Sequence, residues 1–190
     1  WDHAFEVIGP LYAEAKNRGL NFSILNIGGG FPTYYAARVP QIEQIADSIK
    51  INLKKHSLEN VALWVEPGRY LVAEAGVLAS TIIGRESRGS HEWIYLDVGR
   101  FNGLAELFES DDLRYPVITS KDDMANSASL RKEMTLTGPS CDAFDTIFHN
   151  VPINAAVAVG DRVYFGTAGA YTHVYASTFN DFLIPKVIFC

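Results

Sequence analysis

Apolar residues recur with helical spacing in the first part of the chain. The pattern over residues 1–18 predicts an amphipathic helix whose apolar face is formed by Phe5, Ile8, Leu11, Tyr12 and Ala15. The pattern over residues 40–56 predicts a second helix, with an apolar face formed by Ile42, Ile45, Ile49 and Leu53. Each helix is followed by a short apolar run, residues 22–27 and 61–65, which predicts a buried strand. Helix, strand, helix, strand is the order of parallel α/β structure.

The pattern changes near residue 76. Residues 76–84 are β-rich, and further short apolar runs predict strands at 93–96, 133–136, 162–165 and 187–189. The polar residues 110–130 predict an exposed loop with room for a short helix. We therefore expect α/β structure over residues 1–75 and a mostly antiparallel β-domain over residues 76–190.

The first predicted strand ends in three adjacent glycines, Gly28, Gly29 and Gly30, followed by a proline. Residues without a Cβ allow positive φ and a close approach of the backbone to a ligand. A loop whose backbone N–H groups are left free suits an anion, above all a phosphate. The same glycines are also compatible with a plain turn that ends a strand.

The second predicted strand ends in Glu66, Pro67, Gly68 and Arg69. A carboxylate can hold a proton on a heterocyclic nitrogen, and a guanidinium matches a phosphate. In parallel α/β folds the ligand lies beyond the carboxyl ends of the strands. We therefore expect the glycines and Glu66 to lie on one rim. The alternative for Glu66 and Arg69 is a surface salt bridge after a turn.

A further candidate is Cys141, in the run of residues 138–145. The glycine and proline before it favour a loop and an accessible thiol, although most cysteines are buried small hydrophobes. Asp142 follows directly, and Asp145 lies about one helical turn later. Both carboxylates are also compatible with a helix start, where acids complement the helix dipole. For Asp145 we favour this second interpretation.

Tyr171 lies in a loop of small residues, where its hydroxyl can serve a phosphate, although most tyrosines pack with the hydroxyl at the surface. The histidines lack the spacing of metal ligands, so we predict no metal site. They are His3, His56, His91, His149 and His173.

Composition narrows the class of protein. With 48% hydrophobic and 20% charged residues, the chain is typical of a soluble globular protein. A net charge of −6 with scattered Lys and Arg gives no support to nucleic-acid binding. No run reaches the roughly 20 apolar residues of a membrane span, and two cysteines form no disulfide framework, so we expect a cytoplasmic protein. The chain opens inside a helical pattern without Met, which predicts the later part of a longer protein.

Together these segments resemble the pyridoxal-phosphate-dependent decarboxylases of the ornithine/lysine/diaminopimelate family. Within this family they resemble the ornithine decarboxylases most. The resemblance is carried by residues 26–32, 66–70, 138–142 with Asp145, 160–161, 169–172 and 177–180. These segments occur in the family's order and span nearly the whole chain. The resemblance implies a (β/α)8 barrel followed by a β-domain, with residues 1–75 as the last strands and helices of the barrel.

The resemblance also implies a cofactor, pyridoxal 5'-phosphate, and residues that bind it. Gly28 to Gly30 look like the phosphate cradle, with Arg69 and the Tyr171 hydroxyl adding to it. Glu66 looks like the partner of the pyridine nitrogen, in a cofactor-binding segment that includes Pro67 and Gly68.

For the substrate, the resemblance implies roles for two neighbouring residues. Cys141 looks like the acid that protonates the carbanion after carbon dioxide leaves. Asp142 looks like the anchor for the distal ammonium of a diamino acid. In the family both residues reach across a homodimer interface, so the active sites are shared.

The sequence departs from the family pattern in places. The family's Schiff-base lysine lies in the early barrel, so the isolated chain is expected to be inactive. None of the lysines here stands in its motif: Lys16, Lys50, Lys54, Lys55, Lys121, Lys132 and Lys186. Asp181 stands where family members often have glycine. Residues 106–112 are too divergent to place one by one, which leaves ornithine versus lysine open.

Two functions follow as hypotheses. The first is the C-terminal part of a homodimeric ornithine or lysine decarboxylase that makes a diamine for polyamine biosynthesis. The second is a non-catalytic regulator on the same scaffold. Such relatives tend to lose cofactor contacts, whereas this chain keeps the glycines, Arg69, Cys141 and Asp142.

Overall fold

A computed structural model describes residues 1–35, 37–110, 112–122 and 130–190 of the chain. They form two units, one of Trp1–Thr33 with Arg38–Leu71 and one of Tyr34–Ala37 with Val72–Cys190. Each unit has its own apolar core. The sequence predicts a different division of the chain, into domains of residues 1–75 and 76–190. That division stays a prediction.

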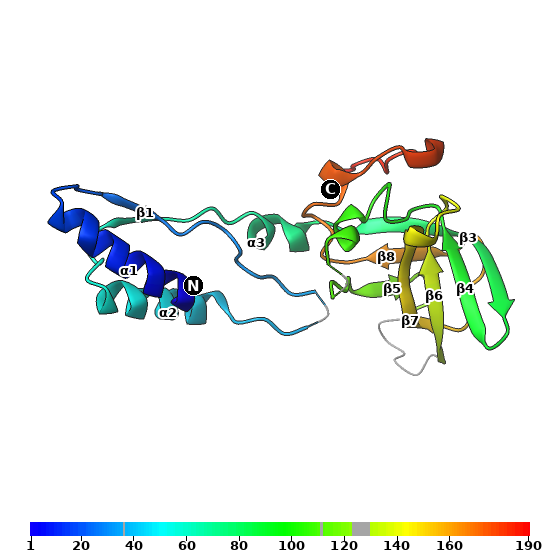
Figure 1. Ribbon diagram of the computed structural model, residues 1–190. Helices are drawn as coiled ribbons and strands as arrows, with labels where there is room; N and C mark the ends of the chain where they lie inside the picture. Colours follow the sequence, from blue (N-terminus) through cyan, green and yellow to red (C-terminus); the bar gives the residue numbers. More distant parts are fainter. Residues whose placement is uncertain (36, 111, 123–129) are drawn as a thin grey trace. The chain divides into compact units, whose positions relative to one another are not determined.

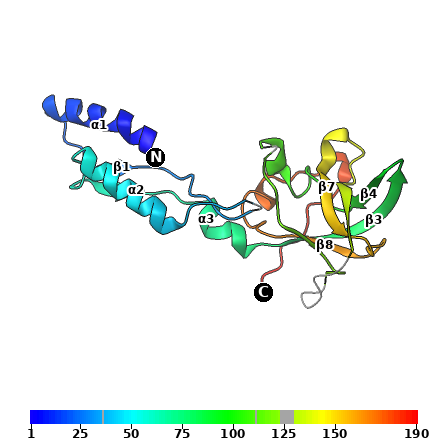
Figure 2. The same cartoon turned by 90° about the horizontal axis from the view of Figure 1, so that it is seen from below.

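The first unit combines two long helices with a sheet of two short strands. Its helices are α1 (Asp2–Asn17) and α2 (Ile42–Lys55), which can be followed with β1 (Ile24–Asn26) in Figures 1 and 2. β1 pairs in parallel with β2 (Ala62–Trp64). This order confirms the predicted parallel α/β arrangement. None of the helices in the described ranges is long and apolar enough to cross a membrane.

The helices bury the faces that the apolar spacing predicts, with one exception. All four predicted residues of α2 and the predicted Phe5, Ile8 and Tyr12 of α1 pack in the core of this unit. Leu11, however, is 64% exposed. It follows Phe5 by six residues, or about 1.7 helical turns, so its side chain points away from the buried face.

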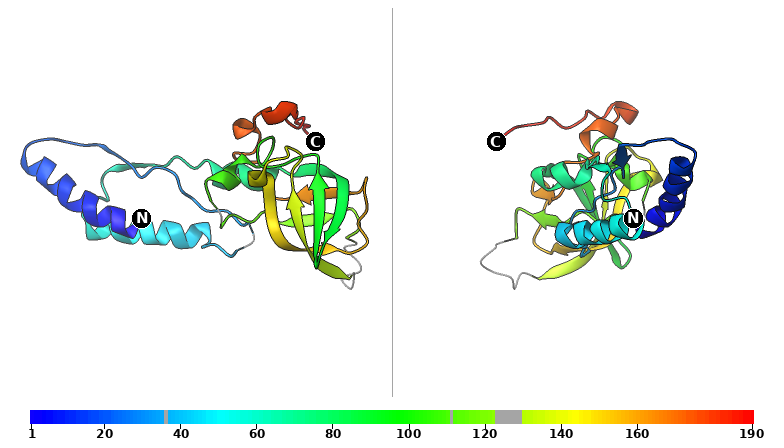
Figure 3. Two further views of the ribbon diagram at one scale, coloured as in Figure 1. Left: turned by 45° about the vertical axis from the view of Figure 1, so that its right-hand side comes forward. Right: turned by 90° about the vertical axis from the view of Figure 1, so that its left-hand side faces the viewer.

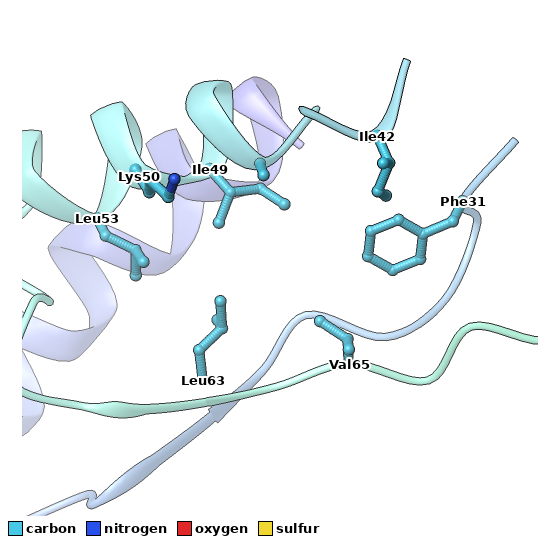
Figure 4. Close-up of a pocket in the computed structure, with 8 residues that line it drawn as sticks. Phe31, Ile42, Ile49, Lys50, Leu53, Leu63 and Val65 are labelled. Atoms are coloured by element: carbon cyan, nitrogen blue, oxygen red, sulfur yellow. The ribbon is translucent and has the colours of Figure 1, made fainter. Parts of the chain in front are cut away.

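The two strands are more exposed than the sequence predicts. All three residues of β2 are exposed, and only Leu25 in β1 is partly buried. An apolar groove of about 220 Å³ lies between α2 and this sheet (Figure 4). Its lining side chains are Phe31, Ile42, Ala46, Ile49, Lys50, Leu53, Leu63 and Val65. The prediction of buried strands is therefore wrong for the described residues of this unit.

The second unit is a six-stranded mixed sheet (Figures 1 and 3). Neighbouring strands follow the order β5-β8-β3-β4-β6-β7, and only the β4–β6 pair among them is parallel. The strands are β3 (Leu78–Arg88), β4 (His91–Leu96), β5 (Val117–Thr119), β6 (Arg131–Thr137), β7 (Thr146–Asn154) and β8 (Arg162–Phe165). The long β3 joins the two halves of the sheet, because its first residues pair with β8 and its later residues with β4.

Some strands differ from the prediction. β4, β6 and β8 contain the predicted runs, and β3 extends the β-rich segment at its C-terminal end. β5 lies within the predicted loop 110–130, of which residues 111 and 123–129 lie outside the described part. β7 was not predicted, since Ile147 and Phe148 are adjacent and both buried, which hides the alternation. The predicted strand 187–189 is wrong, because these residues are exposed and form no strand.

Candidate functional site

In the first unit, Asn26 connects the glycine loop to Glu66. The Oδ1 atom of Asn26 accepts the backbone N–H of Gly28 at 2.8 Å, and its Nδ2 donates to Glu66 Oε1 at 2.5 Å. The Glu66 N–H in turn donates to the Gly28 carbonyl at 2.8 Å. The glycine loop and Glu66 therefore lie together at the ends of β1 and β2, as the sequence predicts.

The glycine loop is shaped for close approach, although its donors are fewer than expected. Gly28 and Gly30 have φ values of +70° and +79°, and a Cβ on Gly29 would lie 2.7 Å from the Glu66 carbonyl oxygen. The expectation of three free N–H groups is wrong for Gly28, which donates to Asn26. Within the described residues, the N–H groups of Gly29 and Gly30 have no hydrogen-bond partner. The loop thus offers two donors and no side chains.

Arg69 lies three residues after Glu66 and begins the short helix α3 (Arg69–Val72). Pro67 and Gly68 connect Glu66 to Arg69, and the Gly68 carbonyl accepts the N–H of Leu71 at 3.1 Å. Backbone N–H groups and a guanidinium suit a phosphate, and a carboxylate suits a protonated ring nitrogen. The donors and acceptors of this strand end therefore fit pyridoxal phosphate in chemical type.

In the second unit, Cys141 is exposed and lies in a left-handed backbone conformation, with φ +59°. The alternative of a buried hydrophobic cysteine is wrong. Asp142 precedes the short 3₁₀-helix η3 (Ala143–Asp145) and caps it, because its Oδ1 accepts the Phe144 N–H at 2.8 Å. Its Oδ2 has no hydrogen-bond partner among the described residues. The cap leaves one carboxylate oxygen for another use.

Asp145 differs from the prediction of a helix-start acid. It is the last residue of η3, and only 1% of its surface is exposed. Its carboxylate accepts the backbone N–H groups of Arg100 at 2.7 Å and of Ser140 at 2.9 Å. Sequence reasoning missed this role because one donor lies 45 residues away. In space, Gly99 and Gly138 leave room for the carboxylate, since a Cβ on either would collide with it.

Tyr171 is 38% exposed, has φ +56°, and lies with its ring centroid 5.4 Å from that of Tyr175. Asn180, also missed, donates its side-chain N–H to the Ser140 carbonyl at 2.8 Å. Asp181 has φ +64°, a conformation that glycine adopts freely and that Asp tolerates better than most residues. The glycine that the resemblance leads one to expect here would adopt this conformation without strain.

The segment that the sequence could not place begins with the 3₁₀-helix η2 (Ala105–Phe108). Glu106 is buried there, and the Tyr115 hydroxyl donates to its Oε2 at 3.5 Å. Asp111 lies outside the described residues. The site residues thus form two described groups, with Gly28 to Gly30 and Glu66 in one unit and Cys141 with Asp142 in the other.

Comparison with known proteins identifies relatives across the chain. Residues 22–169 match the family model described as pyridoxal-dependent decarboxylase, C-terminal sheet domain. The chain is 32% identical to the lysine/ornithine decarboxylase of Selenomonas ruminantium over 100% of the chain and 46% of that protein. It is 28% identical to the ornithine decarboxylase of Schizosaccharomyces pombe over 94% of the chain and 41% of that protein. The chain therefore spans less than half the length of these relatives.

Solved structures agree with this result. The lysine/ornithine decarboxylase of Vibrio vulnificus complexed with cadaverine matches with a TM-score of 0.81 and 34% identity, over 95% of this chain and 47% of that one. SrLDC in complex with PLP and cadaverine matches with a TM-score of 0.84 and 30% identity, over 99% and 48%. Since the family model covers well over half of its residues, the chain belongs to the pyridoxal-dependent decarboxylase family, whose cofactor is pyridoxal phosphate.

Proposed function

We propose that this chain is the C-terminal part of a cytoplasmic enzyme that decarboxylates ornithine or lysine to a diamine, as a step of polyamine biosynthesis. The observation that carries the proposal is the placement of the Glu66 carboxylate beside the glycine loop through Asn26. The relatives described as lysine/ornithine and ornithine decarboxylases support this substrate class. The structures with cadaverine support a diamine as product.

The proposed cofactor contacts lie mainly in the first unit. Gly29 and Gly30 donate backbone N–H groups to the phosphate, and the guanidinium of Arg69 and the hydroxyl of Tyr171 add to them. Glu66 keeps the pyridine nitrogen protonated, so that the ring can accept an electron pair. Pro67 and Gly68 connect Glu66 to Arg69 just after the end of β2.

The proposed substrate contacts lie in the second unit. Pyridoxal phosphate, when bound, supplies the electron sink for the loss of carbon dioxide. The exposed Cys141 thiol then delivers a proton to the carbon that carbon dioxide has left. The Asp142 carboxylate pairs with the distal ammonium, because an unpaired charge in an active-site pocket is costly. This pairing favours diamino acids over other substrates.

The whole protein is proposed to be a homodimer with shared active sites. Residues 1–75 belong to the last part of a (β/α)8 barrel, and residues 76–190 form the β-domain that carries Cys141 and Asp142 into the partner subunit's barrel. A lysine of the early barrel, outside this chain, would hold the cofactor covalently. The isolated chain is therefore inactive.

The test uses the full-length protein with ornithine or lysine as substrate. We expect carbon dioxide release from at least one of them, with one diamine formed per carbon dioxide. Cys141→Ala is expected to lower the diamine formed per carbon dioxide while the absorbance of bound pyridoxal phosphate persists. Normal diamine output from this variant would refute the role given to Cys141.

The alternative is a regulator without catalysis. It would bind no pyridoxal phosphate and release no carbon dioxide from either amino acid. The exposed Cys141 and the open Oδ2 of Asp142 favour the enzyme, because a regulator has no use for them.

A further inference from the structure

Asp145 holds both neighbours of Cys141 in the chain. Its carboxylate accepts the N–H of Ser140, the residue before the cysteine, at 2.9 Å. Its own N–H donates to the carbonyl of Asp142, the residue after the cysteine, at 3.0 Å. Its carbonyl accepts the N–H of Gly138 at 2.9 Å. One residue therefore fixes the loop on both sides of the thiol.

The same carboxylate attaches this loop to the body of the β-domain. Its second oxygen accepts the Arg100 N–H at 2.7 Å, just after β4. Gly99 and Gly138 leave room for the carboxylate, since a Cβ on either would collide with it. From the other side, Asn180 donates to the Ser140 carbonyl at 2.8 Å, so the peptide that leads into Cys141 is held as well.

Cys141 needs such support because its backbone is strained. A residue with a Cβ is disfavoured in the left-handed region, and Cys141 has φ +59°. Left without its hydrogen bonds, the loop would relax toward negative φ and turn the Cys141 side chain to another direction. A strained conformation of this kind persists only where its surroundings determine it.

We propose that Asp145 is a positioning residue for the proposed proton donor Cys141, and that Asn180 assists it. The inference rests on the proposed function, since it concerns where the Cys141 thiol points when the proton is delivered. Asp145 acts through backbone hydrogen bonds and does not touch the substrate. By orienting the Cys141 thiol, Asp145 determines which carbon receives the proton.

The bonding pattern requires a carboxylate rather than an amide. The two oxygens of Asp145 face two N–H donors, those of Arg100 and Ser140. Asparagine has nearly the same shape but only one acceptor oxygen. In Asp145→Asn the side-chain NH₂ group must therefore face one of the two backbone N–H groups. The hydrogen bond to Arg100 or the one to Ser140 is then lost.

The first measurement is the ratio of diamine formed to carbon dioxide released by the full-length holoenzyme. Loss of folded enzyme lowers both quantities together and leaves their ratio unchanged, whereas a misdirected proton lowers the ratio. We expect Asp145→Asn to lower the ratio toward that of Cys141→Ala. Since misplacement of a reacting group by about 1 Å can cost about 100-fold in rate, diamine formation is expected to fall by about tenfold or more.

The second measurement is amide hydrogen exchange in the full-length protein before cofactor is added. In Asp145→Asn we expect exchange in residues 138–145 to become about tenfold faster, because a local opening now costs less. The control is Asp122→Asn, which removes another carboxylate that accepts a backbone N–H, that of Thr119 at 2.7 Å. Asp122 makes its contacts at the ends of β5, β6 and β7, so this control should leave the product ratio unchanged and should not speed the exchange of residues 138–145 beyond that of the rest of the β-domain.

A milder variant keeps the inference testable if Asp145→Asn does not fold. Asn180→Gly removes the bond to Ser140 while glycine retains the φ of +52°. We expect a smaller fall in the same ratio.

The outcomes separate this inference from the proposed function. Faster exchange with an unchanged ratio in both Asp145→Asn and Asn180→Gly would make Asp145 merely structural and overturn the inference. The proposed function would stand in that case if Cys141→Ala still lowered the ratio. An unchanged ratio in Cys141→Ala would refute the proton donor itself, and the inference would fall with it.

Discussion

The side-chain amide of Asn26 donates a hydrogen bond to Glu66 Oε1 across 2.5 Å and joins two residues that are 40 positions apart in the chain. Asn26 ends β1, and Glu66 follows β2. Because Asn26 also accepts the N–H of Gly28, a single side chain orients both the carboxylate and the glycine loop. Asn26 thereby links the two elements to which we assign the ring nitrogen and the phosphate of the cofactor.

Asn26→Asp is expected to weaken cofactor binding in the full-length protein. The new carboxylate can still accept the Gly28 N–H, but it faces the Glu66 carboxylate with the same charge. We expect the dissociation constant of pyridoxal phosphate to rise about tenfold, which corresponds to about 1.4 kcal/mol. A fluorescence titration of the apo-protein measures it.

The matched control is Asn21→Asp. It makes the same change of charge in the same unit, at an exposed residue, and should leave the dissociation constant unchanged. Equal affinities for Asn26→Asp and the unmodified protein would show that Asn26 does not orient Glu66 for the cofactor.

Gly29→Ala tests whether the loop must be free of side chains. The added Cβ would lie 2.7 Å from the Glu66 carbonyl oxygen, so the loop or the end of β2 must shift. Overpacking of this kind costs about 1–3 kcal/mol. We expect a lower melting temperature and a weaker affinity for pyridoxal phosphate, measured by thermal unfolding and by titration.

Gly89→Ala provides the comparison for this variant. Gly89 lies between β3 and β4 with φ +63° and open space around its Cβ position. Alanine there costs about 1–2 kcal/mol of backbone strain, without touching the proposed cofactor site. If both variants lose stability but keep the same cofactor affinity, the glycine loop has no special part in binding.

Features with a local pattern could be predicted from the sequence. Ile42, Ile45, Ile49 and Leu53 recur at helical spacing, and α2 buries them against the rest of its unit. The parallel order of β1 and β2 brings the glycine loop and Glu66 together, because the carboxyl ends of parallel strands meet at one edge. The exposed Cys141 follows from the glycine and proline before it.

Features that depend on distant partners could not be predicted. The burial of Asp145 depends on the Arg100 N–H, 45 residues away, and no local pattern indicates such a bond. The exposure of β1 and β2 also escaped prediction, because an apolar run shows what a strand can bury and not what covers it. β7 escaped because irregular pairing with β6 places Ile147 and Phe148 both inside.

Asp142→Asn separates the two roles that Asp142 can have. Asparagine caps a helix as well as aspartate does, so the bond to the Phe144 N–H and the stability of the protein should persist. The charge that we assign to the distal ammonium is lost. We expect KM for ornithine or lysine to rise about tenfold to 100-fold, since a charged hydrogen bond contributes about 1.5–3 kcal/mol, with a smaller change in kcat.

Steady-state kinetics and thermal unfolding of the same preparation check this expectation. Asp142→Ala serves as the reference, because it loses both the cap and the charge and should also unfold at a lower temperature. An Asp142→Asn enzyme with unchanged KM would leave Asp142 only its capping role.

Asp122 gives the β-domain a stability that depends on pH. Its carboxylate accepts the Thr119 N–H and hydroxyl and pairs with Arg131 at 2.9 Å. Desolvation opposes ionisation, but these hydrogen bonds and the Arg131 charge outweigh it and lower the pKa of Asp122 below its ordinary 3.8.

Because the pKa of Asp122 is lower in the folded state, the stabilisation is complete above the ordinary value and is lost as pH falls through the folded-state pKa. Asp122→Asn should therefore lower the free energy of unfolding near neutral pH by about 1–3 kcal/mol, seen as a lower urea midpoint, and the difference should shrink as the pH falls below the ordinary 3.8. A difference that stays constant over this range would mean that the ionised carboxylate is not what stabilises these strand ends.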